Sequence, residues 1–200
     1  MNENIESKKE LRNLIEAFRS SGDLSLLEPF KLDIKPTEDG WDYDLNAWSR
    51  TKLILELFEN SQYEDKPLIK WLLTEEINGQ EYELQYYTLD VIAYLLYKYM
   101  ENSDVYQLFE SKFAYGNVFH LDVELIFGYD KEEMKQFLSD PNNKHEFNRD
   151  ILLTIQDYEG NPDAKFKTRE EYINYYENRK IVHIKNDISS SENNMKTGKY

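Results

Sequence analysis

The residues best suited to catalysis in this sequence are His120, Asp122 and Glu124, which alternate with apolar residues. In a strand all three side chains would share one face, whereas in a helix His120 and Glu124 would meet at a spacing of four. Either geometry could hold a metal ion or an acid–base pair. The same alternation also describes any half-buried element with a solvated face. These three residues are the catalytic candidates of the sequence. The sequence predicts no resident metal and no cofactor.

Other familiar catalytic and ligand-binding motifs are incomplete. The string HEFNR begins at His145 like a zinc-protease helix, but Arg149 stands where a second histidine must ligate the metal. Asp42 and Asp44 match the first ligands of a calcium loop, yet Ala47 occupies its obligatory glycine position. The chain has no cysteine, no Gly-rich phosphate loop and no GxSxG turn. Thiolate zinc sites, disulfides and the common hydrolase signatures are thereby excluded.

The charge balance is more informative than any motif. The chain has 39 acidic and 24 basic residues, for a formal net charge of −15. Phosphate-binding surfaces gain affinity from Lys and Arg, so this balance argues against nucleic acid as a partner. The excess is uneven, because bases outnumber acids from Lys165 to the end of the sequence. A basic protein is the partner that this composition favours.

One acidic segment also contains aromatic residues, Trp41 and Tyr43, and follows Pro36. Aromatic rings supply buried contact area and carboxylates steer a basic partner, so the segment suits protein recognition. The alternative is a solvated turn whose Trp41 folds back into the core. The predicted partner-binding residues are Glu38, Asp39, Trp41, Asp42, Tyr43 and Asp44.

These features favour an acidic protein-binding module over an enzyme. The most concrete version is a bacterial immunity or inhibitor protein that covers a basic toxin such as a nuclease. One alternative is a metal-assisted hydrolase that uses His120, Asp122 and Glu124. Another is a helical scaffold whose apolar groove receives a peptide. A stoichiometric divalent ion would favour the hydrolase, and an apolar concavity would favour the scaffold. The oligomeric state stays open.

The sequence predicts a soluble cytoplasmic protein that does not bind membranes. Its opening segment, MNENIESKKELRN, lacks the basic and apolar regions of a secretory signal. The longest apolar run, from Val91 to Tyr97, is far shorter than the ~20 residues that cross a bilayer. The absence of cysteine also suits a reducing compartment.

Helical periodicity dominates the segments between glycine and proline residues. It predicts an all-α fold, a single compact domain of about eight helices packed as an orthogonal bundle or a short helical array. The apolar residues near the middle of the chain predict a central helix. The expected helices run from Ser7 to Gly22, Asp44 to Phe58, Pro67 to Ile77, Glu81 to Met100, Asp104 to Tyr115, Lys131 to Ser139, His145 to Tyr158 and Thr168 to Arg179.

Two segments fit this helical pattern less well. Residues 118–127 alternate with a period of two and could form a minor β element, although the helical surroundings favour a helix. Residues 189–200 contain almost no apolar side chains and predict a flexible polar tail. The expected domain organisation is therefore a helical domain over residues 1–188 followed by a tail over residues 189–200.

Overall fold

The computed structural model describes residues 7–36, 42–82, 88–114 and 121–197, and most of these residues are helical. The all-α prediction is confirmed. The described ranges contain nine α-helices: α1 (Lys8–Ser21), α2 (Ala47–Asn60), α3 (Lys66–Gly79), α4 (Leu89–Lys98), α5 (Val105–Phe113), α6 (Lys131–Ser139), α7 (Asn148–Glu159), α8 (Arg169–Tyr175) and α9 (Ile181–Thr197). Shorter elements are the 3-10 helices η1 (Leu24–Phe30), η2 (Tyr63–Asp65), η3 (Gln80–Tyr82), η4 (Asn102–Asp104) and η5 (Val123–Phe127), the π-helical turn η6 (Tyr176–Lys180), and the strands β1 (Ile34–Pro36) and β2 (Asp42–Asp44).

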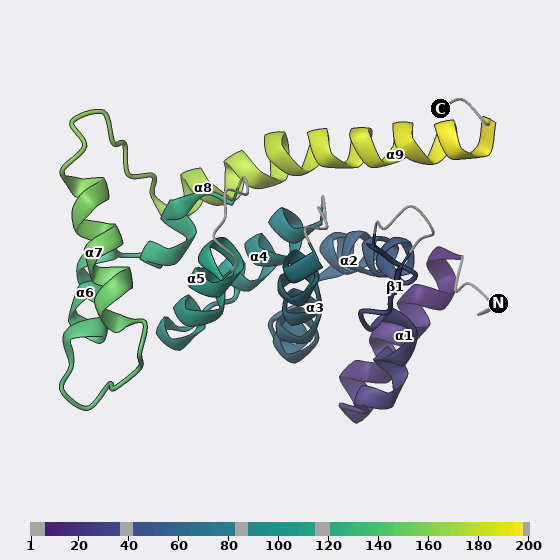
Figure 1. Cartoon of the computed structure of the whole chain (residues 1–200), viewed down its shortest axis with the longest axis horizontal. Coiled ribbons are helices and arrows are strands. Elements are labelled where there is room, and N and C mark those ends of the chain that lie inside the picture. The colour runs from purple at the N-terminus through teal and green to yellow at the C-terminus, as the bar shows by residue number, and fades with distance from the viewer. Residues whose placement is uncertain (1–6, 37–41, 83–87, 115–120, 198–200) are drawn as a thin grey trace.

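The helices form an elongated array rather than a closed bundle (Figure 1). Helices α1 to α5 follow one another along the long axis, and α6 and α7 pair at one end. The continuous helix made of α8, η6 and α9 crosses over the array along the same axis. Of the two packings expected from the sequence, the short helical array is the closer description.

Helix α1 begins and ends where the sequence predicts. The Ser7 side chain accepts a hydrogen bond from the Glu10 amide at 3.3 Å, and the Glu10 carboxylate accepts one from the Ser7 amide at 3.1 Å. Gly22 ends the helix with a φ of 64° and donates its N–H to the Phe18 carbonyl at 2.7 Å. Local cap chemistry fixes both ends of this helix.

Helix α4 is the central helix of the array, as its apolar sequence predicts. All of its side chains from Leu89 to Tyr97 are buried except Asp90, because neighbouring helices cover several of its faces. It begins at Leu89 rather than at Glu81. Gln80–Tyr82 form η3 instead, and residues 83–87 lie outside the described ranges.

An aromatic seam joins the C-terminal helix to α4. Tyr94 stacks on Tyr176 with ring centroids 4.9 Å apart, and Tyr97 contacts Tyr172 at 5.4 Å. All four rings are at most 2% exposed. The Tyr94 hydroxyl also donates to the Glu177 carboxylate at 2.8 Å. Burial of four large rings makes this seam a major attachment of the C-terminal helix.

The π-helical turn η6 keeps one face of the C-terminal helix directed inward. One row of inward-facing residues on this helix consists of the buried Tyr172, Tyr176, Ile181 and Ile188 and the partly buried Ile184. Their spacing is four, five, three and four, and the step of five coincides with η6. A π turn closes over one residue more than an α turn. The wider turn therefore accommodates one more residue than an α-helical turn, and the inward-facing side chains before and after it stay on the same side of the helix.

Helix α9 differs from the polar tail that composition predicts. It runs through Thr197, so the expected boundary after residue 188 falls inside a helix. Ile188 is only 6% exposed, so this part of α9 keeps one side directed towards the array. Composition alone missed the helix because one buried residue, together with continuation from the preceding turns, can keep a polar segment helical.

The helix favoured over a minor β element near residues 118–127 agrees with the described part of this segment. Val123–Phe127 form the 3-10 helix η5, and the Asp122 carboxylate caps it by accepting from the Glu124 amide at 3.2 Å. Residues 118–120 lie outside the described ranges. In the described part of the chain, the strands lie at β1 and β2 instead.

Candidate functional site

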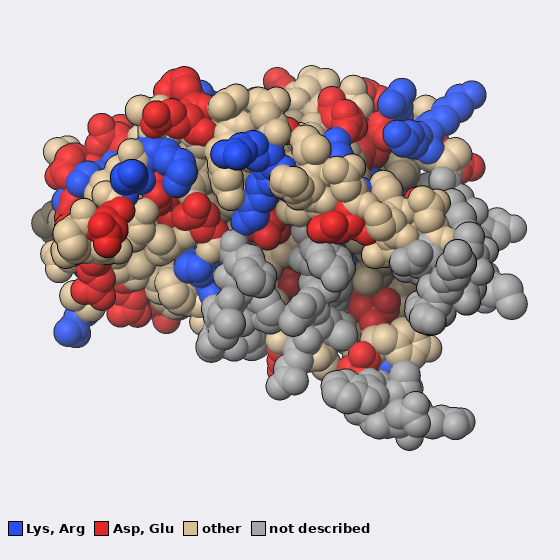
Figure 2. Space-filling model, turned by 90° about the horizontal axis from the view of Figure 1, so that it is seen from above, with Lys and Arg blue, Asp and Glu red and all other residues tan. Residues whose placement is uncertain are grey.

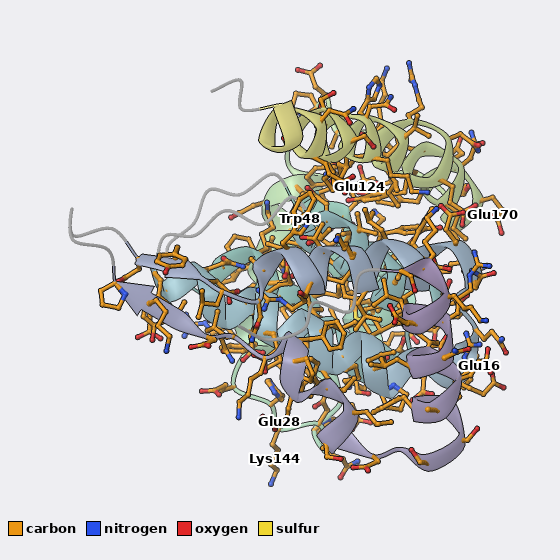
Figure 3. The ribbon with its side chains drawn as sticks, turned by 90° about the vertical axis from the view of Figure 1, so that its right-hand side faces the viewer. Glu16, Glu28, Trp48, Glu124, Lys144 and Glu170 are labelled. Carbon is orange, nitrogen blue, oxygen red and sulfur yellow. The ribbon has the colours of Figure 1, made fainter. Side chains whose placement is uncertain are left out.

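Strands β1 and β2 form a hairpin that projects from the helical body, as Figure 3 shows. The strands are antiparallel, with Ile34 opposite Asp44 and Pro36 opposite Asp42. In the sequence, residues 37–41 connect them. At the base of the hairpin the Leu45 amide donates to the Asp33 carbonyl at 2.9 Å. We call residues 34–45 the binding hairpin, because the predicted partner-binding residues all lie within this range.

A buried ion cluster holds the base of the binding hairpin. Arg50 of α2 is 0% exposed, and its Nη2 lies 2.6 Å from Oδ2 of Asp44. Its Nε lies 2.6 Å from Oε1 of Glu76 in α3, and its Nη1 donates to the Phe30 carbonyl at 3.1 Å. The Thr88 hydroxyl donates to the other oxygen of Glu76 at 3.1 Å. One guanidinium thus ties the hairpin to α2, α3 and η1.

The electrostatics of this cluster keep Arg50 charged. Burial acts to lower the pKa of Arg50, but the carboxylates of Glu76 and Asp44 outweigh burial and raise it. Two acids therefore share one buried guanidinium. Since an isolated charge is costly to bury, each member requires the others. The cluster stabilises the hairpin base, and its burial keeps these charged groups from direct contact with a partner.

Asp44, one of the predicted partner-binding residues, belongs to this cluster. Its side chain is 1% exposed, so it is not a surface contact. It is not the cap of α2 either, because that helix begins at Ala47. Its Oδ1 instead accepts from the amides of Asn46 at 3.0 Å and Asp33 at 3.2 Å. Asp44 shapes the turn from β2 into α2.

The other described members of the predicted set lie on the surface. Asp42 is exposed, and Tyr43 is 45% exposed. Leu45, which the sequence analysis did not select, is 49% exposed beside them. The binding hairpin therefore presents a carboxylate and two large side chains to solvent. Three members of the predicted set lie outside the described residues: Glu38, Asp39 and Trp41.

Two members of the predicted catalytic row, Asp122 and Glu124, lie in the described residues. His120 lies outside them, and Asp122 caps η5. Glu124 is 5% exposed and already accepts hydrogen bonds from Tyr158 at 2.7 Å and from the Lys167 amide at 3.0 Å and Nζ at 3.1 Å. Within the described ranges, no three His, Asp or Glu side chains are grouped so that they could hold a metal ion.

Much of the negative charge is neutralised locally. Glu159 pairs with both Lys131 and Lys135 at 2.6 Å, and Glu177 pairs with Lys98 at 2.8 Å. Figure 2 shows acidic and basic side chains interspersed over the face that carries the C-terminal helix. This face of the molecule is therefore not uniformly negative, and recognition by charge requires a local arrangement of acids.

Sequence reasoning missed Arg50 as a structural residue. Its position gives a signal, because Arg50, Leu53, Ile54 and Leu57 follow the i, i+3, i+4, i+7 pattern of a buried helix face, and all four are buried. A charged residue in that pattern requires a buried counter-ion. Its partners Asp44 and Glu76 could not be chosen from spacing alone.

Comparison with known proteins identifies no relative: no family model matches the chain, nor does any curated protein or solved structure. Among the described residues, no helix has both the length and the apolar character needed to span a bilayer.

Proposed function

We propose that this chain is a protein-binding module that captures a basic protein partner through the binding hairpin, and that it acts as an inhibitor or immunity protein. The observation that carries the proposal is a projecting hairpin with exposed Asp42, Tyr43 and Leu45 on a base fixed by buried Arg50. The net charge of −15 supports a basic partner.

The rigid base supports binding because a preorganised element loses little conformational entropy when a partner docks. Tyr43 and Leu45 supply apolar contact area in the manner of interface anchors. Asp42, with Glu38 and Asp39 close by in the sequence, supplies negative charge that accelerates encounter with a cation-rich surface. Covering the active surface of a basic toxin is the inhibitory mechanism that follows.

The hydrolase alternative receives less support. A metal bound at Glu124 would have to displace Tyr158 and Lys167, which already bind both carboxylate oxygens. Lys167 would then lose its counter-ion, and the hydroxyl of the partly buried Tyr158 would lose its acceptor. The described geometry therefore favours binding over catalysis.

The test is affinity capture with the immobilised full chain from a lysate of the organism that encodes it, at low and at high salt. We expect basic proteins to be retained at low salt and released at high salt. The double variant Asp42→Lys with Tyr43→Ala should reduce their capture at least about tenfold. The matched control is Glu28→Lys with Tyr63→Ala, since Glu28 is exposed on η1 away from the hairpin and Tyr63 is 54% exposed on η2.

Two results would contradict the proposal. One is capture that is unaffected by the hairpin variant, and the other is equal loss in the hairpin and control variants. Unaffected capture would mean that the partner binds a surface other than the hairpin. Equal loss in the two variants would mean that capture depends on net charge alone. For any captured toxin, protection of its substrate by the wild-type chain and not by the hairpin variant checks the inhibitory role.

A further inference from the structure

A cavity of about 320 Å³ lies between α1, α2 and α9, away from the binding hairpin. Leu11, Leu55 and Ile188 give it apolar walls, one from each helix. Trp48 also lines it and lies between α2 and α9 in Figure 3. Its volume is at the lower end of the range for small-molecule sites, so it suits a compact ligand better than a peptide.

The acidic residues around this cavity are already engaged. Glu56 pairs with Arg12 at 2.5 Å, and Glu59 pairs with Lys185. Glu192 also lines the cavity and takes part in an interaction of its own. The negative charges of Glu56 and Glu59 are therefore balanced within the protein.

Two lysines that line the cavity have no acidic partner among the described residues. Lys8 and Lys52 line it, and neither makes an ion pair with the described residues. The Lys52 ammonium lies 6.0 Å from the centroid of the Trp48 ring. The Trp48 indole N–H likewise has no hydrogen-bond partner within the described ranges. In a chain of charge −15, this cavity combines apolar walls with two unpaired cations and a free N–H donor.

We propose that this cavity binds a small amphipathic carboxylate, a molecule with one carboxylate group and a compact apolar body. The apolar body lies against Leu11, Leu55 and Ile188, where its burial supplies most of the affinity. The carboxylate pairs with Lys52 and Lys8 at the rim. Charge complementarity selects an anion over a neutral molecule of the same shape, because only an anion forms charge-assisted hydrogen bonds with the two ammonium groups.

The test is calorimetric titration of the full chain with sodium octanoate and with octan-1-ol, which has a similar apolar body but no charge. Octanoate should bind at least about tenfold more tightly than octanol. In Lys52→Gln that preference should fall severalfold. The matched control Lys144→Gln removes an exposed lysine that Figure 3 shows far from Trp48, and it should keep the wild-type preference.

A second variant tests the cavity independently of charge. Thr51 lines the cavity and is half-buried, so Thr51→Trp fills the space without removing a buried side chain. This variant should lose binding of both probes while retaining the wild-type circular dichroism spectrum. Equal affinity for octanoate and octanol, undiminished binding by a folded Thr51→Trp, or no octanoate binding up to ~10 mM would each overturn the proposal.

Discussion

The guanidinium of Arg50 and the carboxylate of Asp44 lie 2.6 Å apart, and both side chains are at most 1% exposed. Arg50→Met should destabilise the protein by about 3–5 kcal/mol, because it leaves the carboxylates of Asp44 and Glu76 buried without a counter-ion. Urea unfolding followed by circular dichroism measures this loss.

The control for Arg50→Met is Lys35→Met. Lys35 pairs with Asp33 at 3.1 Å, but both side chains are more than a third exposed. Surface pairs contribute little, so this variant should change the free energy of unfolding by less than ~1 kcal/mol. Similar effects of the two substitutions would show that the buried cluster is not needed for stability.

The stacked rings of Tyr94 and Tyr176 differ in what their hydroxyl groups bind. The Tyr94 hydroxyl donates to Glu177 at 2.8 Å, whereas the buried Tyr176 hydroxyl has no hydrogen-bond partner among the described residues. Tyr94→Phe should therefore lower the free energy of unfolding by about 1–2 kcal/mol, and Tyr176→Phe should leave it unchanged or raise it. Thermal unfolding of the two variants measures both effects. A larger loss of stability in Tyr176→Phe than in Tyr94→Phe would contradict this prediction.

Asp104 links stability to pH. Although its burial acts in the opposite direction, hydrogen bonds from Lys66, the Glu101 amide and Lys70 hold the pKa of Asp104 below its ordinary value of 3.8. Because the folded-state pKa is the lower one, this carboxylate contributes stability above about pH 5. The contribution disappears as the pH falls through 3.8 towards the folded-state pKa.

Asp104→Asn should accordingly be much less stable than wild type at pH 7, and the difference should shrink by about pH 3. Urea unfolding of both proteins at several pH values measures this difference in the free energy of unfolding. Asp163→Asn, which removes an exposed carboxylate from a loop, should follow the wild-type pH dependence. A difference between Asp104→Asn and wild type that is constant with pH would contradict this prediction.

Gly128 has a φ of 69° and a ψ of −161°, a backbone conformation that residues other than glycine rarely adopt. A Cβ at this position would lie 2.8 Å from Cε of Met134. Gly128→Ala should cost about 1–3 kcal/mol. Gly160→Ala is the control, because Gly160 has a φ of −71° and a Cβ there would meet its nearest neighbours at 3.5 Å. The melting temperature of Gly160→Ala should stay close to that of wild type. An equal fall in the melting temperatures of both variants would exclude backbone strain at Gly128 as the cause of its destabilisation.

The elements that the sequence predicts best are those with local signals at both ends. The prediction for α6, Lys131 to Ser139, agrees with the structure, since the Asp130 carboxylate caps its first turn. The capping box and terminal glycine of α1 are equally local. Such signals act within a few residues and need no knowledge of the tertiary structure.

The features that could not be predicted depend on distant residues. Arg50 and Glu76 are 26 positions apart, and nothing in their spacing identifies them as partners. Asp44 has the same residue type as Asp42, yet one carboxylate is buried and the other exposed. Helix α9 shows the same dependence, because Ile188 is buried where it lines a cavity with residues of α1 and α2, and a polar local sequence gives no sign of this.

The widened turn at Tyr176–Lys180 determines which changes in chain length the C-terminal helix tolerates. Deleting Asn178 would leave Ile181 four positions after Tyr176, the spacing of an ordinary α-helix. The hydrophobic side chains on both sides of the deletion would keep their orientation, and Glu177 and Lys180 would both be retained. Inserting a residue there would instead require a still wider turn or a rotation of α9 by about 100°. This helix can therefore lose a residue at η6 more easily than it can gain one.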